Sequence, residues 1–188
     1  VYVDDPRVRG VTGRNKRAFR EKGLQELRQK YEDKGSGLIV EKGKTREVLP
    51  ELVQEFNAEE VFYARSYTPT RREIGREIQS LEVDTKSIGD RLLVEPAKLS
   101  QEYDTFSPFY REWKKTKKAA PAEGPGKLAD VDSRTPEMNT EPTADIPEAG
   151  EDAALNRWVK FRRKKMSNYK DKRDDVANPE YVSKLSFY

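Results

Sequence analysis

Hydroxyl and cationic side chains gather in residues 169–188, where their types and spacing suit one kind of chemistry. Hydroxyls and backbone amides donate hydrogen bonds to phosphate oxygens, and a lysine ammonium adds positive charge. The stretch therefore predicts a site that holds a phosphate group. The candidate residues are Tyr169, Ser183, Lys184, Leu185 and Ser186.

Neither cysteine nor histidine occurs among the 188 residues. Disulfides, thiolate zinc sites and cysteine nucleophiles are thereby excluded, and the commonest general base and transition-metal ligand is missing. A metal would need carboxylates alone, and no spacing of Asp and Glu suggests such a site. We predict no metal site, and the lack of cysteine favours an intracellular protein, which we expect in the cytoplasm.

The composition, 34% apolar and 38% charged with a net charge of +3, bounds the fold. So low an apolar share indicates that part of the chain is unstructured. No apolar run approaches the roughly 20 residues that span a bilayer, so no membrane is expected.

The elements that must position the tail follow an alternating pattern in residues 1–113. Apolar runs read as strands and 3.6-residue periodicity reads as helices, and their alternation predicts an α/β fold with a doubly wound parallel sheet. No glycine-rich phosphate loop follows any strand. The predicted strands are 1–3, 38–40, 61–64 and 92–94, and the predicted helices are 14–32, 45–56 and 70–81. Because Pro50 falls inside the second helical pattern, we expect that helix to start nearer Leu49 than Thr45, or to hold Pro50 in its first turn.

Residues 114–150 differ in composition from the rest of the chain, because small, proline and acidic residues replace the large apolar ones. We expect a flexible linker there. An amphipathic helix should begin after Gly150, with Glu151 and Asp152 in its first turn. Its basic continuation has two interpretations: a solvated helix face, or a contact with a nucleic-acid backbone.

An aromatic cluster occupies residues 106–113, at a turn that leads into a short helix. The ordinary interpretation is packing beneath a loop. Stacking of nucleic-acid bases on the rings is the alternative.

Several separate motifs, in the same order along the chain, resemble the photolyase/cryptochrome family. No single motif is highly specific for the family, but the order of the motifs along the chain is. The matching stretches are VYVDDP (1–6), NKRAF (15–19), GKTREVLPEL (43–52), YTP (67–69), LLVEP (92–96), YDTFSPFYREW (103–113), GEDAALNRW (150–158) and VSKLS (182–186).

The resemblance implies a Rossmann-like α/β antenna domain at 1–113, lacking its first strand and helix, a linker at 114–150, and the start of an all-helical FAD-binding domain at 151–188. It implies a monomeric photolyase that repairs pyrimidine dimers in damaged DNA by electron transfer from reduced, light-excited flavin. That chemistry needs no titrating side chain, so we expect no catalytic residue among these. The 188 residues alone are expected to be inactive, because most of the flavin pocket is missing.

The flavin contacts implied by the resemblance fall on Tyr169, Ser183, Lys184, Leu185 and Ser186, beside the FAD diphosphate. Val182 stands where the family usually has threonine, and Lys184 where it often has arginine. An antenna chromophore, a folate or a deazaflavin, is an open expectation. Glu82 lies near the carboxylate of folate-binding members, although an exposed acid at a helix end is its ordinary explanation.

Two other functions remain open at this stage. A cryptochrome-type photoreceptor shares the architecture without repair activity. A small-ligand α/β binding module would instead complete its pocket within residues 1–113.

Overall fold

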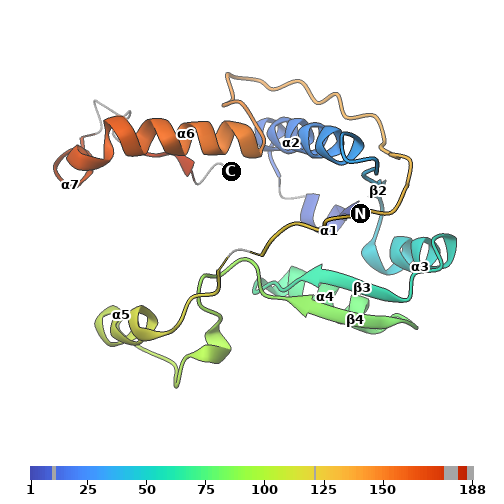
Figure 1. Cartoon of the computed structure of the whole chain (residues 1–188), viewed down its shortest axis with the longest axis horizontal. Coiled ribbons are helices and arrows are strands. Elements are labelled where there is room, and N and C mark those ends of the chain that lie inside the picture. The colour runs from blue at the N-terminus through green and yellow to red at the C-terminus, as the bar shows by residue number, and fades with distance from the viewer. Residues whose placement is uncertain (10–11, 121, 176–181, 186–188) are drawn as a thin grey trace. The chain divides into compact units, whose positions relative to one another are not determined.

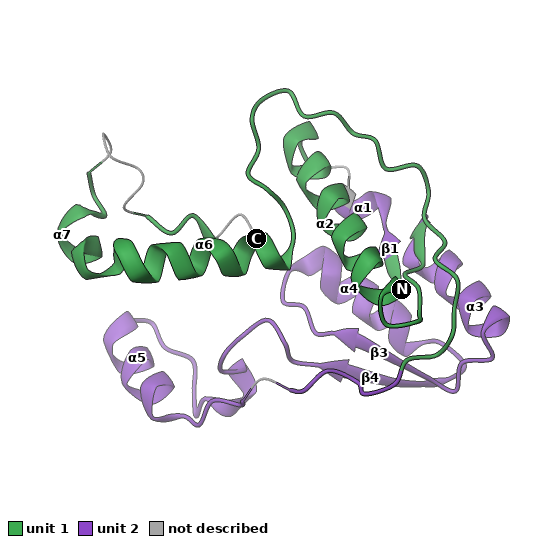
Figure 2. Cartoon of the chain, turned by 45° about the horizontal axis from the view of Figure 1, so that its top comes forward, with its two compact units in different colours: residues 1–2, 10–41, 128–188 green, residues 3–9, 42–127 purple. Residues whose placement is uncertain are grey.

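The computed structural model describes residues 1–9, 12–120, 122–175 and 182–185 (Figure 1). The chain divides into two compact units, each assembled from separated stretches of sequence (Figure 2). Unit 1 comprises residues 1–2, 10–41 and 128–188, and unit 2 comprises residues 3–9 and 42–127. The described elements are helices and short strands, with a parallel strand pair, so the expected α/β class is confirmed.

Unit 1 is organised around the helix α2 (Arg14–Glu32). Its apolar positions recur at helical spacing, and they bury Ala18 and Leu24. Leu24 packs with Leu38 and Val40, and partly buried Tyr2, Tyr31 and Met138 surround these three residues. The helix ends where predicted, and Gly35 follows with a positive φ of 70°.

Short strands accompany this core. β1 (Tyr2–Asp4) and β2 (Val40–Lys42) form a two-stranded sheet. The Tyr2 amide donates to the Ile39 carbonyl at 2.7 Å, and Ile39 forms an isolated parallel bridge with Arg134. The predicted strand at 38–40 is thus buried, although regular pairing begins only at Val40.

Unit 1 continues through α6 (Glu151–Lys164), the 3₁₀ turn η2 (Met166–Asn168) and α7 (Tyr169–Lys172). The helix predicted after Gly150 therefore forms, with both acids in its first turn.

Unit 2 contains α1 (Pro6–Arg9), α3 (Thr45–Glu55) and α4 (Pro69–Gln79), with β3 (Glu60–Ala64) and β4 (Asp84–Ile88). β3 and β4 pair in parallel, from Glu60 opposite Asp84 to Ala64 opposite Ile88. The turn η1 (Pro96–Lys98) and α5 (Phe106–Lys115) complete the unit.

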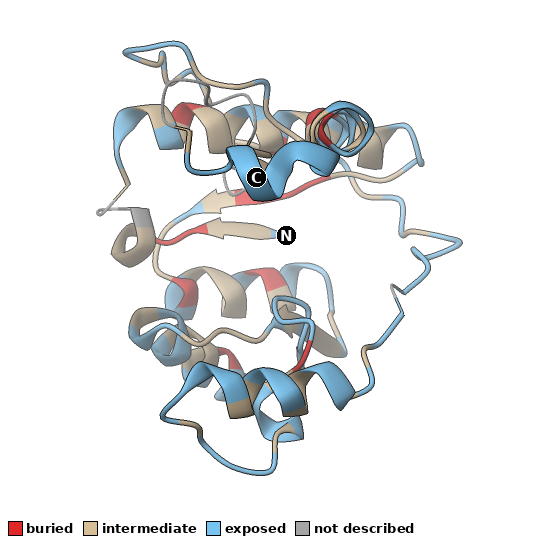
Figure 3. Cartoon of the chain, turned by 90° about the vertical axis from the view of Figure 1, so that its left-hand side faces the viewer, coloured by how far each residue is buried: buried red, intermediate tan, exposed pale blue. Residues whose placement is uncertain are grey.

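The predicted strand at 92–94 is wrong. Leu92 and Leu93 are exposed, and only Val94 of the three is buried. Figure 3 shows that buried residues occupy only short stretches of the described chain. The strand lies earlier, at Asp84–Ile88, where polar and apolar residues alternate only weakly. An apolar run forms a strand only when it pairs with another strand. Here β3 pairs with the more polar segment Asp84–Ile88 and not with residues 92–94. The predicted start of α3 near Leu49 is also wrong, because α3 starts at Thr45 and Pro50 lies beyond its first turn.

Candidate functional site: the α6 anchor of the tail

The beginning of α6 is fixed by side chains from α2, within unit 1. Glu26 accepts hydrogen bonds from the amides of Glu151 (2.9 Å) and Asp152 (3.3 Å), two of the donors that a helix N-terminus leaves unpaired. Lys30 bonds the carboxylates of Asp152 (2.8 Å) and Glu151 (3.1 Å). These hydrogen bonds, foremost the one that Lys30 donates to Asp152, raise the pKa of the Lys30 ammonium. The helix that carries the candidate site is therefore held at its origin by two residues more than 100 positions earlier in the chain.

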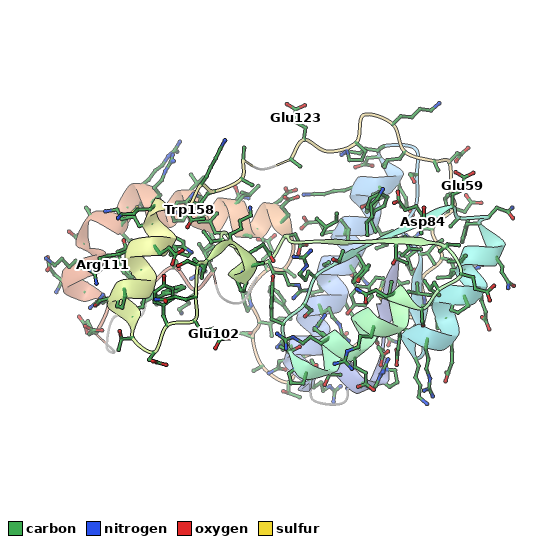
Figure 4. The ribbon with its side chains drawn as sticks, turned by 90° about the horizontal axis from the view of Figure 1, so that it is seen from below. Glu59, Asp84, Glu102, Arg111, Glu123 and Trp158 are labelled. Atoms are coloured by element: carbon green, nitrogen blue, oxygen red, sulfur yellow. The ribbon has the colours of Figure 1, made fainter. Side chains whose placement is uncertain are left out.

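Tyr169 is anchored to α6 by an aromatic contact. Its ring meets the buried ring of Phe161 edge to face, with centroids 5.8 Å apart and an interplanar angle of 83°. The ring of Phe161 also lies next to that of Trp158, which is labelled in Figure 4, with ring centroids 6.3 Å apart. Tyr169 keeps 40% of its surface exposed.

Ser183 is anchored to the same helix through its backbone. The Arg157 Nε donates a hydrogen bond of 2.5 Å to the Ser183 carbonyl. Arg157 and Phe161 are four residues apart, so they are neighbours on one helix face. One face of α6 therefore holds both Tyr169 and Ser183, which are separated by 14 positions in sequence.

The turn at 183–185 has a shape that suits an anion. Lys184 has a φ of 54°, in the left-handed region that non-glycine residues seldom adopt. A left-handed residue within a turn can direct successive amides toward one side, which forms a concavity for anions. The Leu185 amide lies 3.4 Å from the Ser183 hydroxyl, to which it donates.

Four of the five predicted cofactor-binding residues can thus be located. Tyr169 and Ser183 are both held on α6, and Lys184 and Leu185 follow Ser183 in its turn. Ser186 lies outside the described residues. No ligand contact tests these assignments, which stay predictions.

Sequence reasoning missed Arg157 and Glu26 as positioning residues. Arg157 belongs to a strongly basic stretch, so its residue type does not distinguish it from its neighbours. The one available signal is its position, one helical turn before Phe161. Glu26 is one of several acids on α2. Its capping role depends on a tertiary contact that no local pattern reveals.

A second polar cluster lies beyond the carboxyl end of β3, in unit 2. The Tyr67 hydroxyl donates to Glu95, and Arg65 bonds both Glu95 (3.3 Å) and the hydroxyl of Ser87 (3.1 Å). Burial, and then the Glu95 carboxylate, raise the pKa of Tyr67. Oε1 of Glu95 is buried, and it has no hydrogen-bond partner among the residues that the structure describes. Glu82, the other acid singled out in this unit, is exposed just past α4.

The described residues contain no group of acidic side chains that could hold a metal ion. Within the same residues, no helix is both long and apolar enough to cross a membrane.

The family model for DNA photolyase matches residues 1–126, which is most of the chain. The chain belongs to the DNA photolyase family. A deoxyribodipyrimidine photo-lyase of Thermus thermophilus is 30% identical over 189 aligned positions, which cover 100% of this chain and 44% of that protein.

Two solved structures share the photolyase fold. A bacterial class III photolyase from Agrobacterium tumefaciens superposes with a TM-score of 0.81 at 24% identity, covering 98% of this chain and 42% of that one. A cryptochrome from Synechocystis sp. gives a TM-score of 0.79 at 23% identity, with 98% and 45% covered. The chain therefore spans less than half the length of the photolyase relatives that it matches.

Proposed function

We propose that these residues form part of a light-driven, FAD-dependent deoxyribodipyrimidine photolyase that repairs pyrimidine dimers in damaged DNA. One observation carries the proposal: a single face of α6 holds Tyr169 and the turn at Ser183 together, in a chain of the DNA photolyase family. Residues 151–188 would then supply one wall of the flavin site, and residues 114–150 would join that wall to the α/β domain.

The residues of this wall fit a diphosphate. The hydroxyls of Tyr169 and Ser183 can donate to phosphate oxygens, and Lys184 supplies a charge beside them. The left-handed backbone at Lys184 can direct a neighbouring amide toward the same phosphate. Reduced FAD, when bound and excited by light, supplies the electron that splits the dimer.

The contribution of the chain's own residues is binding and orientation rather than proton transfer. Arg157 fixes the carbonyl of Ser183, and the serine hydroxyl, which accepts from the Leu185 amide, can still donate its own hydrogen to a phosphate. Val182 offers no hydroxyl where the family usually has threonine, which forfeits one hydrogen bond worth about 1 kcal/mol. Lys184 keeps the positive charge without the two-pronged geometry of arginine.

A repair assay tests the proposal. The full-length protein that carries these residues is mixed with dimer-containing DNA, and dimer loss is compared under blue light and in darkness. We expect repair in light only. Repair in darkness, or none in light from a protein that holds reduced flavin, would refute the proposal.

A cryptochrome-type blue-light photoreceptor is the second candidate, because the fold matches that of the Synechocystis cryptochrome nearly as well as that of the Agrobacterium photolyase. It predicts light-dependent reduction of the bound flavin without dimer repair, so the same samples separate the two. Membership of the photolyase family favours either flavin function over a small-ligand module confined to residues 1–113.

The 188-residue chain by itself should retain no stoichiometric flavin. The described part of residues 151–188 forms only α6 and the short turns after it, which can provide one wall of a pocket. Visible absorbance of the purified chain measures this directly. A yellow protein with one flavin per chain would show that the wall suffices.

A further inference from the structure

Three aromatic rings stack along one face of α5, in unit 2. The ring centroids of Phe106 and Tyr110 are 5.5 Å apart with an interplanar angle of 15°, and those of Tyr110 and Trp113 are 6.0 Å apart at 18°. The spacings of four and three residues place the rings on one helix face. We call Phe106, Tyr110 and Trp113 the aromatic ladder.

The ladder is closed at one end and open at the other. At the closed end, the Lys118 ammonium sits 4.3 Å from the Trp113 ring centroid and also donates to the carbonyls of Trp113 and Lys114. At the open end, Phe106 exposes 70% of its surface, which is more than any other large apolar residue in the described chain. A flat partner can therefore extend the stack at Phe106.

Two exposed acids, Glu102 and Asp104, precede the ladder in sequence, and cations follow its rings. Residues 106–118 carry five cations and a single acid, Glu112. That acid is engaged elsewhere, since it accepts from the amide (2.7 Å) and hydroxyl (3.0 Å) of Ser100. Within the described residues, no carboxylate pairs with the exposed cations Arg111 (labelled in Figure 4), Lys114, Lys115 and Lys117.

The row of side chains continues from ring to cation. Lys114 follows Tyr110 by four residues, as Tyr110 follows Phe106, so a lysine lies next to the rings on the helix surface. A partner that covers this face must therefore present both flat apolar faces and negative charge at short intervals. A purely apolar protein helix would leave these cations unpaired at its border.

We propose that the aromatic ladder and its cations bind single-stranded nucleic acid, with one base stacked on Phe106 and neighbouring phosphates contacting Lys114 and the adjoining cations. Every base has a π-face, so such a platform needs no particular sequence. Bases within a duplex already stack on each other and cannot offer a face to Phe106. This surface shares no residue with the proposed flavin wall, so the two proposals can be tested independently.

Fluorescence anisotropy of a labelled oligothymidylate of roughly 15 nucleotides, titrated with the full chain, tests the proposal. We expect tighter binding of the single strand than of a duplex of the same length. Phe106→Ala should weaken single-strand binding about ten-fold, the effect of losing one stacked base. Phe106→Leu should weaken it nearly as much, because leucine keeps the apolar volume without the flat face.

Matched substitutions elsewhere act as controls. Phe62→Ala removes another exposed aromatic, 60% accessible on β3, and should leave the affinity unchanged. Lys114→Gln should reduce the dependence of binding on salt by about 0.7 in the logarithmic slope, the value for one phosphate contact with a single strand. Lys22→Gln, at an exposed lysine of α2, should not change the slope.

Several outcomes would overturn the proposal. Undiminished oligonucleotide binding by Phe106→Ala, with native circular dichroism, would remove the stacking platform. Full binding by Phe106→Leu would indicate an apolar docking surface instead. Binding to phosphatidylserine vesicles that depends on Phe106, without any for the oligonucleotide, would assign the face to a lipid surface.

Discussion

At the residue scale, Arg157 and Asp5 each fix a segment that lies far from them in sequence. Arg157 ties the Ser183 carbonyl to α6. Asp5, only 3% exposed, accepts from the amide and hydroxyl of Thr45, both at 2.9 Å, and from Arg7. Arg7 reaches on to Glu77 at 2.7 Å, so one carboxylate and one guanidinium link α1, α3 and α4 within unit 2.

Replacing Arg157 by methionine should weaken FAD binding by the full-length protein about ten-fold. The substitution keeps the stem of the side chain but removes a charged hydrogen bond worth about 1.5 kcal/mol, and the turn at Ser183 loses its anchor. Isothermal titration with FAD measures the effect. Arg163→Met, at an exposed position of the same helix, is the control. Equal affinities for the two variants would show that Arg157 does not position the turn.

Asp5 should make the free energy of unfolding depend on pH in the acid range. Burial alone would raise the pKa of its carboxyl, but hydrogen bonds from Arg7 and Thr45 outweigh burial and hold the pKa well below its ordinary value. Because the unfolded carboxyl titrates near pH 3.9, roughly, the stabilisation is complete above that pH and declines as the pH falls below it.

Urea unfolding from about pH 6 down to about pH 3 measures this dependence. Asp5→Asn should lower stability by about 2 kcal/mol at neutral pH and flatten the acid decline. Asp130→Asn, at an exposed acid, should match the parent chain at every pH. An equally steep acid decline in Asp5→Asn would place its origin in other carboxyls.

At the scale of elements, two backbone features constrain the packing. Pro50 lies inside α3, where it provides no amide for the helix and crowds the preceding turn. Gly37 lies where residues 131–133 pass: a Cβ there would come within 3.0 Å of backbone atoms of Val131, Asp132 and Ser133.

Pro50→Ala should raise the melting temperature, because it restores a backbone hydrogen bond in α3 and relieves the clash. The free energy of unfolding should rise by only about 1 kcal/mol, because the surroundings of Pro50 are already adapted to the proline ring. Pro69→Ala is the matched control: Pro69 begins α4, where proline is favoured, and its loss should not stabilise the chain. A lower melting temperature for Pro50→Ala would contradict the argument.

Gly37→Ala should destabilise unit 1 by roughly 2 kcal/mol, because the added methyl meets backbone atoms that cannot rotate away. Thermal unfolding followed by circular dichroism measures the loss. Gly13→Ala, whose added methyl would meet nothing within 4 Å, should be nearly neutral. Similar melting temperatures for the two variants would mean that residues 131–133 move aside without cost.

Local patterns predicted the helices well and the strands less well, for physical reasons. α2 has strong periodicity and a glycine beyond its end, so its limits follow from its own residues. β4 forms because it pairs in parallel with β3, and the polar residues of β4 do not predict this pairing. Leu92 and Leu93 have no such partner strand among the described residues and are exposed. The α6 anchor was equally hidden: Ser183 could be proposed from its chemistry, but Arg157 only from tertiary geometry.

At the scale of the whole molecule, the second half of the predicted linker makes regular contacts with α2. Thr140 bonds Glu21 through its amide and hydroxyl, both at 2.9 Å, and Thr143 bonds Asn15 in the same manner at 2.7 and 2.9 Å. Arg134 pairs with Glu41 at 2.7 Å. The domain boundaries at 113 and 150 stay a prediction, but these contacts divide the segment between them into two parts of different character.

Limited trypsin digestion should distinguish the two parts. Cleavage is expected first after Lys117, Lys118 or Lys127, and much later after Arg134, whose backbone bonds both Leu38 and Val40. Mass spectrometry of early fragments identifies the sites. Equally early cleavage after Arg134 would show that residues 128–150 detach readily from α2 and that the entire segment behaves as a linker.

Unit 1 is built from stretches that lie far apart in sequence, and this affects how the chain folds as it is synthesised. Its contacts include Leu38 with Ser133, which are 95 positions apart, and Asn15 with Thr143, which are 128 positions apart, whereas unit 2 is nearly continuous in sequence. A ribosome therefore releases all of unit 2 before α2 can meet its partners in residues 128–188, although Leu38 and Val40 can cover Leu24 earlier. We expect part of the α2 surface to stay uncovered during that interval, which makes α2 a candidate for chaperone binding.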